Sequence, residues 1–366
     1  MKTKLQVHRI PYGVPEWYEF RKNGIGGSEC GTVLNLNPYE SAAELFHNKI
    51  GTLEPRTEDT QFMFWGREHE DKIAEIWQYF DGTESGYIEN KKTGKIIRKC
   101  RSVNGYVVNP DYPWLFASLD RLINKEGGIN MLTGKPLEEE AILECKTLSY
   151  WASSVWTDGI PVYFLTQIQT YMLIFEVDYS EIAILSDGNK FHVEYIERDD
   201  TLCQQIAEIT KRWWYERVVP AKEAFKLREL ASIEGKPKEV DAQNGIIDQL
   251  EPPPDDTEAY RQFQSDKFLK ERETVEGSME MFDVCKKDEM LKKIEGRVGK
   301  ERSQIKNTLI KWIVEKGAEL VDFDALGKYT YTLRKGAKNR SLLVSIKEKP
   351  TEERVEEEFN KLNLKY

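Results

Sequence analysis

Cysteine and histidine are scarce in this chain and widely scattered. The five cysteines form no CxxC pair, and only four histidines occur in 366 residues. Structural zinc sites, iron–sulfur clusters and disulfide frameworks need closely spaced cysteines or histidines. The spacing therefore argues against all three, and against an iron–sulfur helicase–nuclease.

Long apolar runs and an excess of positive charge are also missing. No run approaches the roughly 20 apolar residues of a membrane span, and the opening MKTKLQVHRIPYG lacks the apolar core of a secretory signal. We therefore expect a cytoplasmic protein without membrane association. The net charge of −10 disfavours a general nucleic-acid coat. A DNA-cleaving enzyme is still compatible, because acidic metal ligands add negative charge and basic residues can be local.

What the sequence does contain is typical of a globular protein of mixed α and β structure. Apolar residues make up 40% of the chain and aromatic residues 11%, which excludes a disordered protein. The length suggests two domains. We expect a mixed α/β domain over residues 1–222, a linker rich in Pro, Asp and Gly over 223–256, and a C-terminal helical hairpin with a β-hairpin over 257–366, the latter turning at residues 336–339.

Periodicity predicts the elements of the first domain. Helices are expected over residues 17–21, 41–50, 63–80, 161–175 and 201–218. Strands are expected over residues 96–100, 106–108, 115–123, 141–148, 181–185 and 191–196.

The strand predicted from AILECKTL, residues 141–148, carries two charged residues. Glu144 and Lys146 are two positions apart, so both side chains point to one face of the strand. An exposed ion pair is the common meaning of this pattern. The alternative is a site that needs a carboxylate beside an amine.

Three further polar residues lie among apolar neighbours. Asp120 lies in WLFASLDRLIN, where an ionised carboxylate is costly unless it is paired or bound to a metal. Glu70 is the one acid on the apolar face of its helix, and Gln167 lies on a helix that is apolar nearly all round. Taken singly, each has a structural explanation: a turn cap, a salt bridge, or a hydrogen bond to backbone.

Taken together, these residues suit a metal-dependent hydrolase. Asp120 and Glu144 on neighbouring strands, with Glu70 from a helix, supply the oxygen ligands that Mg²⁺ or Mn²⁺ prefers. Lys146 then stands where it can help activate a water for attack on phosphorus. Gln167 can orient that water or the lysine.

The segments GIGGSE, WGREHE, ASLDRL, LECKT and QIQTYM resemble the YqaJ-type viral recombinase (lambda exonuclease) family of the PD-(D/E)XK nuclease superfamily. The pattern E-x-K alone is not specific, but five motifs in the family's order are. The resemblance spans about residues 12–220. It implies a restriction-endonuclease-like core, a central mixed sheet flanked by helices. The C-terminal helical and β-hairpin extension expected from the residue pattern lies outside the resemblance.

The resemblance also assigns roles to individual residues. The residues implied at the metal centre are Asp120, Glu144, Glu70 and the carbonyl of Cys145, with Lys146 and Gln167 beside them in catalysis. Those implied at a terminal 5′-phosphate are Arg21, Ser28 and, as a weaker match, Ser118. Independently of the resemblance, Ser28 after GIGG is expected to cap the next helix, and a helix N-terminus beside an arginine suits a phosphate.

Two features depart from the family pattern. The connection from Asp120 to Glu144 is longer than in lambda exonuclease and is expected to form an extended hairpin. Where that relative has a further phosphate-binding arginine after the lysine, this chain has TLSYWASS, without a basic residue.

The activity implied is metal-dependent 5′-to-3′ degradation of one strand of linear double-stranded DNA. The 3′ tail would pass to a single-strand annealing protein in phage-type recombination, inside a bacterial host cell. A homo-oligomer, trimeric in the family, is also implied. An endonuclease on the same core and a catalytically silent DNA-binding scaffold are the alternatives, and one or two metal ions are both compatible with the sequence.

Overall fold

The structure is a computed structural model that describes residues 4–53, 60–83, 85–149, 156, 159–267, 277–315, 320–322, 327–333 and 340–346. The chain divides into two compact units, residues 1–269 and 270–366, and each is described by itself. No helix in the described ranges combines the length and apolar character needed to cross a bilayer.

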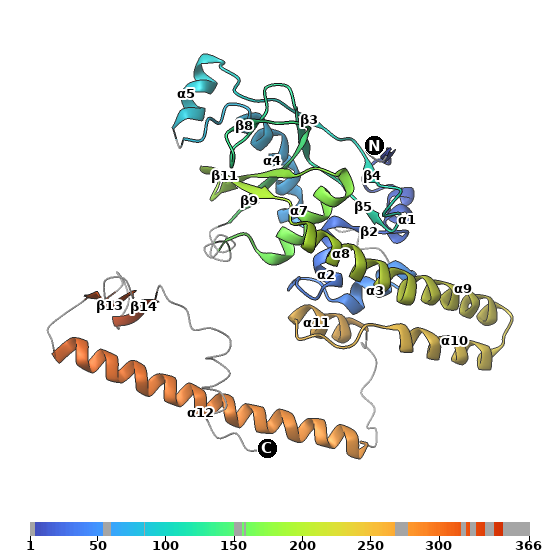
Figure 1. Cartoon of the computed structure of the whole chain (residues 1–366). Coiled ribbons are helices and arrows are strands. Elements are labelled where there is room, and N and C mark those ends of the chain that lie inside the picture. Colours follow the sequence, from blue (N-terminus) through green and yellow to red (C-terminus); the bar gives the residue numbers. More distant parts are fainter. Residues whose placement is uncertain are drawn as a thin grey trace. The chain divides into compact units, whose positions relative to one another are not determined.

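A five-stranded mixed sheet forms the centre of the first unit (Figure 1). Its order is β11 (Lys190–Glu197), β10 (Tyr179–Ser186), β9 (Ala141–Leu148), β6 (Arg121–Ile123) and β3 (Cys100–Ser102). Strands β9 and β10 are parallel, and the other neighbours are antiparallel. The predicted α/β class with a mixed sheet is therefore confirmed.

Helices cover both faces of this sheet. The helices of the first unit are α1 (Pro15–Lys22), α2 (Gly27–Val33), α3 (Ala42–Ile50), α4 (Gln61–Trp77), α5 (Gly86–Thr93), α7 (Val162–Phe175), α8 (Asp200–Arg212), α9 (Val219–Ile233), α10 (Pro237–Leu250) and α11 (Glu258–Lys267). Leu143 and Cys145 of β9 pack in one apolar cluster with Trp77 of α4. Ile142 packs in the other cluster with Ile168 of α7. Alternate residues of β9 thus belong to opposite faces, and the central strand is buried on both.

Smaller two-stranded pairs border the central sheet. They are β1 (Gln6–His8) with β4 (Tyr106–Val108), β2 (Ile25–Gly26) with β5 (Leu115–Phe116), and β7 (Ile129–Asn130) with β8 (Lys135–Pro136). The last pair is the hairpin expected in the long connection before Glu144. The strand predicted over 115–123 is divided: β5 pairs with β2, and β6 belongs to the central sheet. Its apolar residues are buried in both places, so hydrophobicity alone did not reveal the break.

Two helices lie where the composition predicts a linker. After α8 the chain forms a π-helical turn over Trp213–Val218 and continues directly into α9. Helix α10 then packs beside α9 (Figure 1). Pro237 is the first residue of α10, where its missing N–H removes no helical hydrogen bond, and Ile247 is buried. The predicted linker is therefore wrong over α9 and α10, because a proline that begins a helix has the same local composition as a linker. The predicted domain limits stay a prediction.

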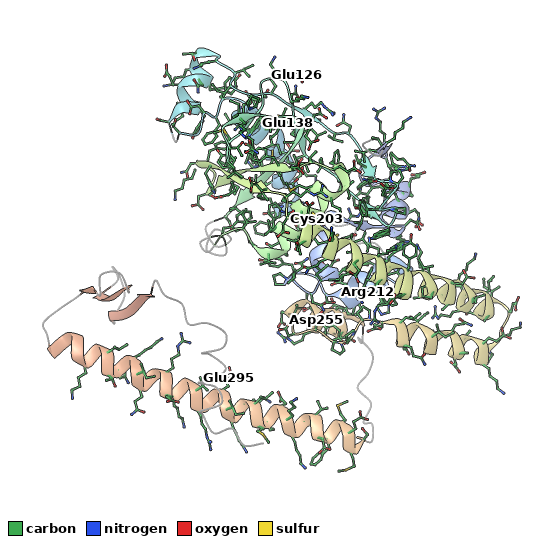
Figure 2. The ribbon with its side chains drawn as sticks, viewed as in Figure 1. Glu126, Glu138, Cys203, Arg212, Asp255 and Glu295 are labelled. Carbon is green, nitrogen blue, oxygen red and sulfur yellow. The ribbon has the colours of Figure 1, made fainter. Side chains whose placement is uncertain are left out.

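The second unit contains α12 (Met279–Glu315) and a three-stranded antiparallel sheet, β12 (Leu320–Asp322), β13 (Gly327–Leu333) and β14 (Arg340–Ile346). The predicted β-hairpin is present as β13 and β14, but its turn at 336–339 lies outside the described residues. The first helix of the predicted helical hairpin, α11, belongs to the first unit. Side chains project from α12 over residues 279–309 (Figure 2), and Val284, Leu291 and Val298 are among its exposed apolar residues.

Candidate active site

Strand pairing brings Asp120 beside Glu144. Strands β6 and β9 are antiparallel with Arg121 opposite Leu143, so the same register places Asp120, one residue before β6, opposite Glu144. The Oδ2 atom of Asp120 accepts a hydrogen bond from the backbone N–H of Cys145 at 2.8 Å. The break between β5 and β6 thus ends at an acid that is fixed to the central strand.

Glu144 is a buried carboxylate with only one of its oxygens satisfied. Its side chain is 5% exposed, and Oε1 accepts a hydrogen bond from Nε2 of Gln167 at 3.0 Å. The other oxygen, Oε2, is buried and has no hydrogen-bond partner among the described residues. Burial, followed by repulsion from Asp120, raises the pKa of Glu144 well above its usual value. Such a group calls for a proton or a cation.

Lys146 shares the face of Glu144, as the period of two predicts. Its Nζ atom lies 4.5 Å from the centre of the Phe164 ring on α7, and the same helix supplies Gln167 to Glu144. One helix therefore contacts both the acid and the amine. Phe164 was not singled out in the sequence, because an aromatic residue on a buried helix looks like ordinary core.

The described hydrogen bonds of Gln167 go to side chains and not to the backbone. Besides Glu144, its Nε2 donates to the hydroxyl oxygen of Tyr171 at 3.1 Å. Tyr171 in turn explains a glycine of the GIGG motif: a Cβ on Gly27 would lie 2.3 Å from its ring. Gly27 therefore allows α2 to approach the helix that holds Glu144.

Glu70 approaches this centre from α4. It is half-buried, and burial, then the charge of Asp120, raises the pKa of its carboxyl to about 7. Glu70 also contributes to the raised pKa of Glu144. The three acids are thus within electrostatic reach of one another, and Lys146 partly offsets their charge.

The donor set fits a hard divalent cation. In the described part of the chain, no three His, Cys, Asp or Glu side chains converge closely enough to hold a metal ion by themselves. Mg²⁺, however, is usually bound through one or two carboxylates and keeps several waters, so Asp120 and Glu144 suffice. The unpaired Oε2 of Glu144 fits such an ion. The side chain of Cys145 packs in the apolar cluster on the α4 side, which leaves only its backbone carbonyl as a ligand.

The structure places Arg21 in a second charged cluster. Its Nη2 donates to Oε1 of Glu29 at 2.7 Å, and its guanidinium carbon lies 5.1 Å from the Trp17 ring centre. Ser28 and Ser118 are exposed. The expectation that Ser28 caps α2 is wrong, because Gly26 holds the cap position and its N–H donates to Oε2 of Glu29 at 2.7 Å.

Sequence reasoning missed Glu29 and its partner Lys49. Glu29 stands at the third position of α2, where an acid commonly bonds back to the cap residue, and that spacing was a usable signal. Lys49 is only 3% exposed. Nothing in HNKIG distinguishes it from a surface lysine, since its partner lies 20 residues away.

Residues 16–178 match the model of the YqaJ-like viral recombinase domain. This segment is similar to a YqaJ-like viral recombinase domain. The resemblance predicted from the five motifs is confirmed, and every predicted site residue, from Arg21 to Gln167, lies inside the matched segment.

One relative and two solved structures illustrate the likeness. The chain is similar to an uncharacterized protein YqaJ of Bacillus subtilis (strain 168), 29% identical over 207 residues, which is 56% of this chain and 56% of that protein. The chain thus spans little more than half the length of this relative. It is also similar to an alkaline exonuclease from Laribacter hongkongensis, with TM-score 0.42 and 19% identity over 60% of this chain and 100% of that one. A phage-related exonuclease from Haemophilus somnus 129PT matches with TM-score 0.32 and 11% identity, over 53% and 93% of the two chains.

Proposed function

We propose that this protein is a metal-dependent 5′-to-3′ exonuclease on linear double-stranded DNA, producing 3′ tails for recombination by annealing. The observation that carries the proposal is the unpaired, buried Oε2 of Glu144 beside Asp120 and Lys146. The match of this segment to a viral recombinase domain supports a nuclease role in recombination. The direction of digestion and the fate of the tails rest on the family resemblance.

We assign the metal ligands to Asp120, Glu144 and the carbonyl of Cys145, with Glu70 at the edge of the site. Mg²⁺ or Mn²⁺ fits these oxygen donors. When bound, the ion supplies neutralisation of charge at the scissile phosphate and makes water more acidic. A single ion needs only Asp120 and Glu144, whereas Glu70 becomes a ligand if a second one binds.

The chain's own residues then have separate tasks. Gln167 holds Oε1 of Glu144, so that Oε2 faces the metal position. Lys146 orients the attacking water and exchanges a proton with it at Nζ. The Phe164 ring against Lys146 restricts where that nitrogen can lie. Proton transfer by a positioned group is commonly worth about 10²- to 10⁴-fold in rate.

The proposal also covers the binding of the DNA end, the partners and the oligomeric state. Arg21, with Ser28 and Ser118, receives the terminal 5′-phosphate of a DNA end. The partners are a double-stranded DNA end and a single-strand annealing protein, in the cytoplasm of a phage-infected or lysogenic bacterium. Homo-oligomers, trimeric as the resemblance implies, are the proposed assembly.

The deciding experiment is digestion of linear duplex DNA with Mg²⁺, labelled separately at the 5′ and 3′ ends, beside a closed circular duplex. We expect mononucleotides from the 5′ label first and an intact circle. A cleaved circle would replace the exonuclease with an endonuclease on the same core. Binding without cleavage of either DNA would leave the scaffold alternative.

A further inference from the structure

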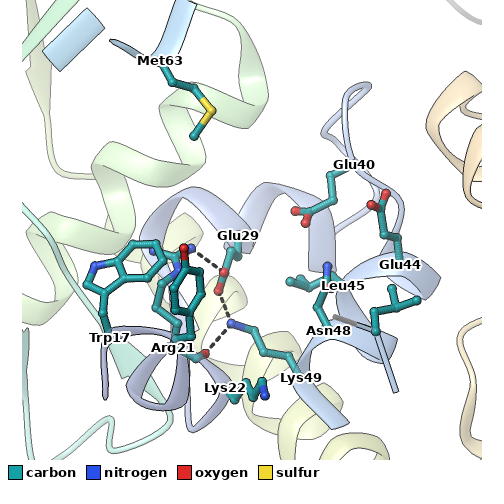
Figure 3. Close-up of a pocket in the computed structure, with 12 residues that line it drawn as sticks. Trp17, Arg21, Lys22, Glu29, Glu40, Glu44, Leu45, Asn48, Lys49 and Met63 are labelled. Carbon is teal, nitrogen blue, oxygen red and sulfur yellow. Dashed lines mark hydrogen bonds and ion pairs between the residues drawn. The ribbon is translucent and has the colours of Figure 1, made fainter. Parts of the chain in front are cut away.

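A pocket of about 290 Å³ lies between α1, α2 and α3 (Figure 3). Arg21 and Trp17 line one side of it, and Glu40 and Glu44 lie on the other. Between them Glu29 and Lys49 form the charged centre that links Arg21 to the rest of the pocket. None of these residues takes part in the carboxylate site on β9.

Glu29 distributes its two oxygens over three donors. Oε1 accepts from Nη2 of Arg21 at 2.7 Å. Oε2 accepts from Nζ of Lys49 at 2.6 Å and from the N–H of Gly26 at 2.7 Å. Because Oε2 is occupied, Glu29 does not form the two-pronged pair that a carboxylate makes with a free guanidinium.

Lys49 restrains both the backbone carbonyl of Arg21, directly, and its guanidinium, through Glu29. Its Nζ also donates to the backbone carbonyl of Arg21 at 2.7 Å. This carbonyl lies in the last turn of α1, where carbonyls have no N–H of the same helix from which to accept a hydrogen bond. Through Glu29, Lys49 also fixes the guanidinium of Arg21. The guanidinium carbon lies 5.1 Å from the Trp17 ring centre and 5.7 Å from the Phe116 ring centre. Arg21 is still 29% exposed, so an incoming anion can reach it.

The charges decide what this arrangement can bind. Arg21 and Glu29 alone would form a neutral pair, and the carboxylate would repel a phosphate. Burial lowers the pKa of Lys49, and the carboxylate of Glu29 at 2.6 Å opposes that shift. With Lys49 protonated, the group of three has a net charge of +1, in a site where burial strengthens electrostatic interactions. Glu40 on the far side of the pocket repels a phosphate less than an ordinary carboxylate would, because burial raises the pKa of its carboxyl to about 7.

We propose that Lys49 is a positioning residue that keeps Arg21 available and electropositive for the terminal phosphate of a DNA end. This rests on the proposed function, and it adds a residue for which the five sequence motifs gave no signal. Lys49 acts through Glu29: it neutralises that carboxylate, so that Arg21 retains charge and donors for the phosphate.

The test compares KM and kcat on linear duplexes that carry either a 5′-phosphate or a 5′-hydroxyl. Lys49→Met should raise KM for the phosphorylated end about tenfold, the size of one lost charged contact, while kcat and the KM of the hydroxyl end stay unchanged. In the double variant Lys49→Met with Glu29→Gln, Arg21 has no carboxylate to neutralise it, so the preference for the phosphorylated end should return.

Lys222→Met is the matched control. Lys222 donates to the carbonyl of Lys22 at 3.0 Å and to Oδ1 of Asn23 at 2.8 Å. It therefore also secures the end of α1, but it contacts neither Arg21 nor Glu29 in any described hydrogen bond. This variant should leave the preference for the phosphorylated end unchanged.

Three outcomes would overturn the proposal while leaving the nuclease function intact. They are a wild-type enzyme that digests both ends equally, a Lys49→Met variant that keeps the wild-type preference, and a loss that affects both ends alike. If Lys49→Met does not fold, Glu29→Gln decides alone: the preference should be kept or strengthened, and a weakened preference contradicts the proposal. Failure of the wild type to cleave any linear duplex would instead refute the proposed function.

Discussion

Two buried glutamates on neighbouring strands have opposite surroundings. Glu144 on β9 and Glu181 on β10 lie in parallel strands, and Glu181 pairs in register with Leu143, one residue from Glu144. Glu181 accepts hydrogen bonds from Nε1 of Trp77 at 2.8 Å and from the hydroxyl of Tyr179 at 3.0 Å, and it forms a buried ion pair with Arg98. Glu144 accepts a hydrogen bond from the Gln167 amide on Oε1, and its Oε2 has no hydrogen-bond partner among the described residues.

Burial raises the pKa of both carboxyls, yet only one of them is compensated by the protein. Around Glu181, a cation and two neutral donors satisfy the carboxylate. Arg98 lies 4.2 Å from the Trp77 ring centre, although its Nε and Nη2 atoms have no hydrogen-bond partner among the described residues. Around Glu144, two further acids add repulsion. The first arrangement stabilises a fold, whereas the second is stable only with a proton or a cation, which is typical of functional sites.

The largest expected effect is on activity, from Glu144→Gln. Cleavage of linear duplex DNA should fall by about 10³-fold or more, because removing the charge removes a metal ligand. The thermal unfolding temperature of the metal-free protein should not fall, since an uncompensated buried charge has been removed. Cleavage at wild-type rates would show that the unpaired carboxylate is not catalytic.

Lys146→Ala should separate binding from chemistry. We expect cleavage to fall by about 10²- to 10⁴-fold, with the affinity for DNA within a few-fold of wild type in a fluorescence anisotropy titration. Asp120→Ala should lose metal binding as well as cleavage. Unimpaired cleavage by Lys146→Ala would contradict its assignment.

Glu181→Gln should damage stability and leave chemistry intact. It leaves Arg98 buried without its counter-charge, which costs on the order of 3–5 kcal/mol of the free energy of unfolding. Chemical denaturation of the metal-free protein measures this loss, and the cleavage rate per folded molecule should be unchanged. An equal loss of stability in Glu144→Gln would erase the distinction between the two glutamates.

The smallest effect is a pH-dependent stabilisation by Mg²⁺. The pKa values of Asp120, Glu144 and Glu70 are raised in the fold, that of Glu70 to about 7. The metal-free native state therefore binds more protons than the unfolded state, and its stability falls as pH rises through 7.

Because a cation replaces those protons, Mg²⁺ should stabilise the protein more at pH 8 than at pH 6, by about 1–2 kcal/mol. Thermal unfolding with and without Mg²⁺ at the two pH values measures the difference. Asp120→Ala should abolish it, and a larger Mg²⁺ effect at pH 6 would contradict the sign.

The sequence predicted best those elements whose pattern is local. Strand β9 has the predicted bounds, and α7 begins one residue later than predicted, because long apolar runs determine their own secondary structure. The face shared by Glu144 and Lys146 followed from the strand period alone. Local pattern could not show that the segment 115–123 changes sheets, since both halves are equally apolar.

Partners distant in sequence were not predictable in this way. Arg98 and Glu181 are 83 residues apart, and Lys49 and Glu29 are 20 apart. Each charge alone resembles a solvated surface residue, and only the fold shows that it is buried against an opposite one. The buried amide of Gln167 evidently needed a hydrogen-bond partner, but the sequence around it did not show whether that partner is Glu144 or a backbone group.

The change of sheet between β5 and β6 also sets a mechanical limit. Phe116 stacks on Arg21, and Asp120, four residues later, bonds to β9 beside Glu144. Four residues of extended chain span at most about 14 Å, so the chain itself limits how far apart the Cα atoms of these two residues can lie. The proposed phosphate site at Arg21 and the proposed metal centre therefore cannot move independently of each other. A DNA end bound at Arg21 stays within a limited distance of the metal centre.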